Sequence, residues 1–407
     1  MQTTSRLHPN IHKLVISEAL SKLGDNFTEV ALALFVLSVT RNNVAALGVV
    51  LAMVYVPRVA LGWAVVGFID RLPKRAVLLG SNLGRALLVA SIPFVSRYSW
   101  AVAAVFLMYT FSMVYQPVLR AIQPQIAGTA EMNAKGNARQ ETYMALADIG
   151  GYVAAGGVLF IWGIKPAFLV DAATFIGAGF LVGGIRAGHD VWGQVASNER
   201  GFWQQLSEGV GYLKTEITVR HLVFLSGLVA LGVGTLNTLL APLSHGLWHV
   251  SSKHYVWLLL ALALGSLVSG ILIERRELLQ KYSVSVLLGI GFFLTALGFG
   301  LLVFVHSWEV GAVCLALVGF GNSFYGSALM MWVQQAVPLE FRGRALAVRG
   351  SLMGVGGALG AMFGGVVAQD VGLPATIGLT SAVWLLATLW SLTARSLKTP
   401  RSSEQTA

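Results

Sequence analysis

Four ionisable side chains recur along one apolar segment near the amino terminus. The segment SEALSKLGDNFTEVAL contains Glu18, Lys22, Asp25 and Glu29. At about 100° per residue of helix, these four side chains point within about 60° of one another. A charge that faces lipid at the middle of a membrane costs about 2.5 to 3.5 kcal/mol. We therefore expect this face to contact protein or a water-filled cavity.

Asp25 and Arg58 fall near the middle of two predicted helices that follow one another and run antiparallel. At a separation of about 4 Å and an effective dielectric constant near 20, such an ion pair gains roughly 4 kcal/mol. We predict that Asp25 and Arg58 form a central charge pair. For Glu18 and Lys22, which lie nearer the cytoplasm, a structural pair at i,i+4 is the alternative to a functional role.

Glu29 has no obvious partner, because the five charges near this face, including Arg58, sum to −1. A buried carboxyl group without a cation binds a proton more readily than an exposed one. We predict Glu29 as the first candidate for proton coupling and Asp148 as the second. Asp25 is the third candidate, since a pair with Arg58 would keep it ionised.

Composition indicates what kind of protein holds these residues. The chain has 407 residues, of which 56% are hydrophobic and 11% are charged, whereas a soluble domain has roughly 25% charged residues. A membrane-spanning helix needs about 20 mostly apolar residues. Twelve such stretches are predicted, at 14–39, 44–69, 76–96, 99–120, 140–163, 166–185, 220–243, 254–273, 283–305, 308–336, 344–369 and 372–395.

The arrangement of these stretches predicts an all-α membrane protein of two six-helix halves, at 1–185 and 220–407. A linker at 186–219 separates them and contains FWQQLSEGVGYLK, a pattern typical of an amphipathic surface helix. Most of the 28 Lys and Arg residues fall in loops on the side of the amino terminus. Because positive loops stay in the cytoplasm, we expect both termini to be cytoplasmic in a multi-pass cell-membrane protein. The net charge of +10 then needs no nucleic-acid partner.

Polar and aromatic side chains recur on single faces of several other predicted helices. Such faces suit the binding of an amphipathic organic molecule. The candidates for a substrate cavity are Tyr109, Ser112, Gln116, Tyr152, Asn237, Asn322, Tyr325 and Trp332. Arg85 and Asp171, on the third and sixth predicted helices, are expected to pair structurally.

The loop after the second predicted helix carries Asp70, Arg71, Lys74 and Arg75 in the sequence DRLPKR. Together with the twelve-helix layout, it resembles the loop signature of the major facilitator superfamily of secondary transporters. Four further segments, SKLGDNFTEVALALFV, VPRVALG, FLVDAATF and FRGRALAVRGSL, resemble its drug and siderophore exporter branch. The resemblance implies that these four loop residues, with Arg349, form a cytoplasmic gate.

Several other functions lack the residues that they need. No lysine follows a glycine, so the phosphate-binding loop of ATP-driven pumps is absent from the sequence. Neither a nucleophile elbow nor a zinc-protease helix occurs, and the single cysteine, Cys314, permits no intrachain disulfide. We expect a carrier that is not an enzyme, holds no cofactor or metal, and acts as a monomer.

These observations favour proton-coupled export of a small amphipathic compound by alternating access. Helix 140–163 contains paired glycines in DIGGYVAAGG but not the Gly-Pro that antiporters of the resembled family usually show. A metal-ion transporter of the ferroportin type and a lysophospholipid transporter are the alternatives, because both have a similar first helix. A membrane sensor with a transporter-like fold is a further alternative.

Overall fold

The computed structural model describes residues 9–61, 72–193, 217–251, 254–274, 282–337 and 339–393. Every regular element in these ranges is a helix, as predicted. Within these ranges, ten helices are long and apolar enough to cross a membrane. The first helix, α1 (Pro9–Val39), has 31 residues and is also long enough to cross a membrane. It differs from those ten because it carries the charged face formed by Glu18, Lys22, Asp25 and Glu29.

The described helices group by contacts into two units, which are taken in turn. Unit 1 comprises residues 1–41 and 60–201, and unit 2 comprises residues 42–59 and 202–407. The predicted halves at 1–185 and 220–407 stay a prediction, as does their linker. The predicted amphipathic helix of the linker lies outside the described residues.

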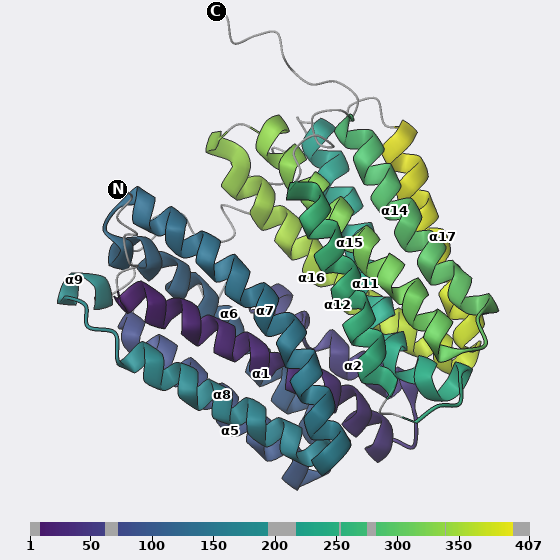
Figure 1. The fold of residues 1–407 in the computed structure, drawn as a ribbon, viewed down its shortest axis with the longest axis horizontal. Helices are drawn as coiled ribbons and strands as arrows, with labels where there is room; N and C mark the ends of the chain where they lie inside the picture. The colour runs from purple at the N-terminus through teal and green to yellow at the C-terminus, as the bar shows by residue number, and fades with distance from the viewer. Residues whose placement is uncertain are drawn as a thin grey trace, which may run out of the picture. The chain divides into compact units, whose positions relative to one another are not determined.

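Unit 1 consists of α1 and five further helices, bounded as follows: α5 (Lys74–Val95), α6 (Tyr98–Ala127), α7 (Ala130–Trp162), α8 (Ile164–Gly183) and the short α9 (His189–Trp192). Helix α1 packs against both α7 and α8, and α5 packs against α6 and α8. In Figure 1, α1 runs between α7 and α8. Its charged face therefore meets protein.

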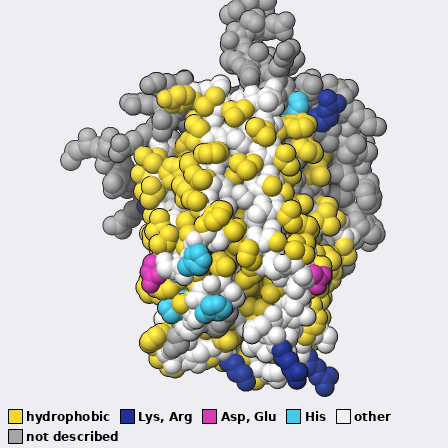
Figure 2. All heavy atoms as spheres, turned by 90° about the vertical axis from the view of Figure 1, so that its right-hand side faces the viewer, with side chains coloured by type: hydrophobic (Ala, Val, Ile, Leu, Met, Phe, Trp, Pro, Cys, Tyr) yellow, Lys and Arg dark blue, Asp and Glu magenta, His cyan; other side chains and the backbone are white. Residues whose placement is uncertain are grey.

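Unit 2 contains the remaining helices, bounded as follows: α2 (Val44–Ala52), α3 (Val56–Ala60, at its boundary), α11 (Ile217–Pro242), α12 (His254–Glu274), α14 (Val284–Leu301), α15 (Trp308–Ala336), α16 (Leu339–Asp370) and α17 (Leu373–Thr393). Helix α16 packs on α11 and α2, and α14 packs on α15 and α17. Figure 2 shows a face of the molecule that is covered mostly by hydrophobic side chains over the helices of this unit. Such a surface suits lipid.

The second predicted helix, 44–69, is wrong as one continuous element. Helix α2 ends at Ala52, residues 53–55 form turns, and α3 begins at Val56. Pro57 explains the break, because its nitrogen cannot donate a hydrogen bond and its ring clashes with the preceding turn. Residues 62–69 of this predicted span lie outside the described residues.

Candidate functional site

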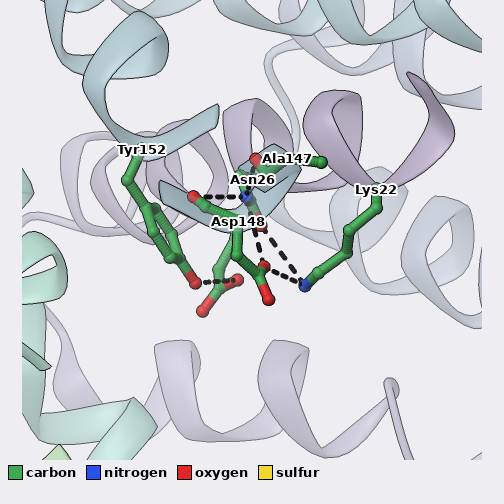
Figure 3. A network of polar contacts seen from close by, with 6 residues as sticks. Lys22, Asn26, Ala147, Asp148 and Tyr152 are labelled. Atoms are coloured by element: carbon green, nitrogen blue, oxygen red, sulfur yellow. Dashed lines mark hydrogen bonds and ion pairs between the residues drawn. The ribbon is translucent and has the colours of Figure 1, made fainter. Parts of the chain in front are cut away.

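The charged face of α1 is paired with α7. Lys22 Nζ lies 2.8 Å from Asp148 Oδ1 on α7, and the two side chains are 29% and 41% exposed. Figure 3 shows Lys22 reaching toward Asp148 from the neighbouring helix. Among the described residues, Asp148 is the carboxylate that forms an ion pair with Lys22 within 4 Å. The alternative pair between Glu18 and Lys22 is therefore not formed in this structure.

Asn26 fixes the register of these two helices. Its side chain is fully buried, and Nδ2 donates to the backbone carbonyls of Ala147 at 3.2 Å and Asp148 at 3.0 Å (Figure 3). Lys22 Nζ donates to Asn26 Oδ1 at 3.4 Å. A Cβ atom at Gly151 would lie 2.6 Å from Asn26 Nδ2, so glycine at this position lets α7 approach α1 closely.

Glu29 lies beside Tyr152, which belongs to the same helix as Asp148. The Tyr152 hydroxyl donates a hydrogen bond to Glu29 Oε2 at 3.0 Å. The Glu29 side chain is half-buried. Glu29 therefore has a neutral donor as partner, which the sequence did not show, and Tyr152 contacts the predicted coupling residue.

Asp25 is surrounded by charges from unit 1. Arg85 on α5 exerts the strongest attraction on its carboxyl group, followed by Lys22, while Glu29 and Asp148 repel it. Arg58 is exposed and belongs to unit 2. The predicted pair of Asp25 with Arg58 stays a prediction, and the cations that act on Asp25 inside unit 1 are Arg85 and Lys22.

A second polar group lies where α1 meets α8. Thr28 Oγ1 donates a hydrogen bond to Asp171 Oδ2, and Thr174 Oγ1 donates to Asp171 Oδ1 at 3.3 Å. Asp171 is fully buried. A Cβ atom at Gly24 would collide with the side chains of Thr174 and Asp171, so only glycine permits this approach.

Arg85 is the cation next to this group. Its side chain is 4% exposed and its guanidinium carbon lies 4.7 Å from the ring centre of Tyr115 and 4.3 Å from that of Phe175. Its charge acts on Asp25 and on Asp171. The expected pairing of Arg85 with Asp171 is not seen as a direct ion pair, because none within 4 Å joins them among the described residues.

The charges in this layer of unit 1 do not balance. Asp25, Glu29, Asp148 and Asp171 are the carboxyl groups, and Lys22 and Arg85 are the cations that act on them. If all six groups were ionised, their charges would sum to −2. Nearer the amino-terminal end of α1, Glu18 is 6% exposed and lies close to Gln116 and Arg120.

The predicted gate residues differ in what they contact. Lys74 Nζ donates to Val191 O at 3.1 Å and to Gln125 Oε1 at 3.3 Å, and Arg75 donates to Gly183 O. Both therefore hold the chain that follows α8. Arg349 Nε donates to Ser226 Oγ at 3.1 Å in unit 2. Asp70 and Arg71 lie outside the described residues, and the gate stays a prediction.

The predicted cavity residues are spread over both units. In unit 2, the Tyr325 hydroxyl donates to Asn322 Oδ1 at 2.9 Å, while the Tyr325 ring packs 4.6 Å from Phe292. Tyr325 and Trp332 are both buried in the hydrophobic core of this unit. The remaining members differ in exposure: Tyr109, Ser112, Tyr152 and Asn237 are half-buried and Gln116 is exposed. Their role in a cavity stays a prediction.

Sequence reasoning missed Asn26, Thr28, Asn82 and Tyr115. Asn26 begins an Asn-Phe-Thr glycosylation pattern, which a buried helix makes meaningless, and it lies off the charged stripe. Its spacing of four residues from Lys22 was the signal that could have found it.

Comparison with known proteins shows what the chain resembles. A sequence model described as Major Facilitator Superfamily matches residues 222–407. Macrolide efflux protein A of Streptococcus pyogenes is 20% identical over 371 residues, covering 88% of each chain. The protein of that name from Enterococcus faecalis is 21% identical over 314 residues, covering 74% of this chain and 94% of its own. The chain is thus similar to the major facilitator superfamily over its second half and to these efflux proteins over most of its length.

Solved structures agree on the fold. A bacterial homologue of the human lysosomal transporter Spinster, inward-facing and unoccupied, has a TM-score of 0.75 at 14% identity, with 95% of this chain and 97% of that chain covered. A bacterial homologue of the iron transporter ferroportin has a TM-score of 0.76 at 14% identity, covering 94% and 98%. The predicted all-α transporter fold is confirmed. The apolar helices and these relatives agree with the prediction of a multi-pass membrane carrier rather than an enzyme.

Proposed function

We propose that the protein exports a small amphipathic organic compound from the cell in exchange for protons, by alternating access. The observation that carries this proposal is the acid excess of unit 1, where four carboxyl groups share two cations. Buried uncompensated carboxylates are costly in a membrane. Protons, or a cationic part of a cargo, would remove the excess charge of −2.

Glu29 and Asp148 are the carboxyl groups that we propose to exchange protons. They take part in two neighbouring contacts between α1 and α7, because Tyr152 contacts Glu29 and Lys22 contacts Asp148. Their side chains are partly exposed, so water can reach both. Protonation of Asp148 would release Lys22 from its ion pair and loosen the contact between α1 and α7.

The substrate class follows from the relatives. Two of them are named for macrolide efflux, and macrolides are amphipathic organic molecules. We propose cargo of that kind, a location in the cell membrane with both termini in the cytoplasm, and a monomer as the working unit.

The test uses inside-out vesicles, a radiolabelled macrolide and an imposed pH gradient. Vesicles with the wild-type protein are expected to accumulate the macrolide only when the gradient is present. Glu29→Gln and Asp148→Asn should each reduce this accumulation at least tenfold, while Glu309→Gln, at an exposed acid on α15, should not. Unchanged gradient-driven flux in both variants would refute the coupling assignment. Uptake of radiolabelled ferrous iron instead of the macrolide would favour the ferroportin-like alternative.

A further inference from the structure

Four buried polar atoms on α1, α5 and α6 make no close hydrogen bond among the described residues. They are Ser21 Oγ, Asn82 Nδ2, Arg85 Nε and Tyr115 OH, and their side chains are at most 6% exposed. Tyr115 and Asn82 are within hydrogen-bonding reach of each other, so Ser21 Oγ and Arg85 Nε are the atoms that most need another partner. A buried polar atom that stays unpaired is unfavourable, because it has lost its hydration without gaining a hydrogen bond.

Asn82 and Arg85 on α5 and Tyr115 on α6 are neighbours, and Ser21 lies on α1. Arg85 donates to Asn82 Oδ1 at 2.6 Å, and its guanidinium lies against the Tyr115 ring. The Tyr115 hydroxyl is close to the side chains of Ser17 and Asn82, and Ser21 follows Ser17 by one helical turn. We call Ser21, Asn82, Arg85 and Tyr115 the buried polar cluster.

Carboxyl groups lie on both sides of the buried polar cluster. On one side, Asp25 and Asp171 repel each other and are both attracted by Arg85. Two carboxylates and one guanidinium leave an excess charge of −1, which a single proton would neutralise. On the other side, the charge of Glu18 acts on Tyr115.

The atoms of the cluster fit water. Arg85 Nε and Asn82 Nδ2 can only donate, whereas the two hydroxyl groups can donate or accept. A buried water typically makes about three hydrogen bonds to such groups. In hydrocarbon, groups of this kind must be satisfied within the protein or by water held inside it.

We propose that the buried polar cluster binds ordered water, and that this water carries protons between Glu18 and the Asp25–Asp171 pair. The proposal rests on the proton coupling put forward above, and it adds Asp171 and the cluster to that machinery. A proton leaves Asp25 or Asp171 for the first water, and that water passes one of its own protons onward. The last transfer forms an O–H bond on the Glu18 carboxylate. Glu18 then releases its proton to cytoplasmic water.

Every element around this path contributes charged or titratable groups that bias the transfer. Helix α1 carries both acids and a base, α5 and α6 supply cations and a phenol, and α7 and α8 supply acids. The groups are Glu18, Lys22, Asp25 and Glu29 on α1, Arg85 on α5, Tyr115 and Arg120 on α6, Glu141 and Asp148 on α7, and Asp171 on α8.

The test measures proton uptake without any substrate. The purified full-length protein in lipid nanodiscs is taken through a rapid drop in pH, and infrared difference spectroscopy follows the carbonyl band of protonated carboxyl groups. Wild-type protein should develop this band, and Asp25→Asn or Asp171→Asn should remove part of it. Tyr115→Phe and Ser21→Ala should each slow its growth about tenfold with little change in final amplitude, since each removes one link worth about 1.4 kcal/mol.

Two conservative variants control for general damage. Ser38→Ala removes a hydroxyl from the same helix that bonds Phe35 O at 2.7 Å, and Tyr98→Phe removes one from the start of α6. Both should leave the rate unchanged. Wild-type rates in both Tyr115→Phe and Ser21→Ala would overturn the water path, and an intact band in both aspartate variants would overturn the proton site. Failure of macrolide transport with an unchanged band would refute the export function alone.

Discussion

Removing Lys22 should destabilise the protein far more than removing its partner Asp148. The layer that contains this pair has four carboxyl groups and two cations. With all six groups ionised, Lys22→Gln changes their summed charge from −2 to −3, whereas Asp148→Asn changes it from −2 to −1. The two substitutions delete the same ion pair, so any difference between them reports the acid excess.

The expected magnitude follows from the distance and the exposure of the pair. At about 4 Å and a dielectric constant near 20, two charges interact by about 4 kcal/mol. The Lys22 and Asp148 side chains are 29% and 41% exposed, so water weakens the interaction toward the range of surface pairs. We expect a coupling energy of about 1–2 kcal/mol. Lys22→Gln alone should cost about 2–3 kcal/mol, and Asp148→Asn less than about 1 kcal/mol.

The assay is equilibrium unfolding of both single variants and the double variant in phospholipid and SDS mixed micelles. The control is the exposed pair Lys135 and Glu131 on α7, whose atoms are 2.6 Å apart and which should show much weaker coupling. The deficit of Lys22→Gln should shrink as the pH falls, because protonation of the carboxyl groups removes their mutual repulsion. An Asp148→Asn variant that is destabilised as much as Lys22→Gln would refute the acid excess.

Three further substitutions test individual contacts. Gly151→Ala should cost about 1–3 kcal/mol in unfolding free energy, because its Cβ would lie 2.6 Å from Asn26 Nδ2; a wild-type unfolding curve would show that α1 and α7 are not closely fitted there. Tyr152→Phe removes the hydrogen bond to Glu29 and should shift the pH dependence of vesicle transport, whereas an identical pH profile would separate Tyr152 from coupling. Lys74→Met removes the bond to Val191 O and should speed proteolysis after α8; equal cleavage rates in the two proteins would contradict an anchoring role.

Much of the fold could be predicted from the sequence because hydrocarbon allows few backbone structures. Apolar stretches of the right length predicted most of the helices within a few residues, for example α15 at 308–336. The second predicted span failed at Pro57, whose presence in VPRVALG was a visible signal of a break.

For each contact in the candidate site, the sequence predicted the residue on α1 but not its partner. The shared face of Lys22 and Glu29 follows from helical geometry, and both side chains do face α7. Which partner each residue meets depends on how the helices pack. Lys22 pairs with Asp148, 126 positions away, instead of with Glu18 one turn away, and helical periodicity alone cannot show such a choice.

These contacts give α1 two sides that differ in their exposure to water. Toward α7, Lys22 and Glu29 make polar contacts that are partly exposed, and such contacts can exchange with water. Toward α5, α6 and α8, Arg85 and Asp171 are buried, and Gly24 brings the backbones close together. Asp25 receives charge interactions from both sides, from Lys22 and from Arg85. A proton on Asp25 would weaken both interactions at once, so this single residue can connect titration of the buried side with the ion pair on the exposed side.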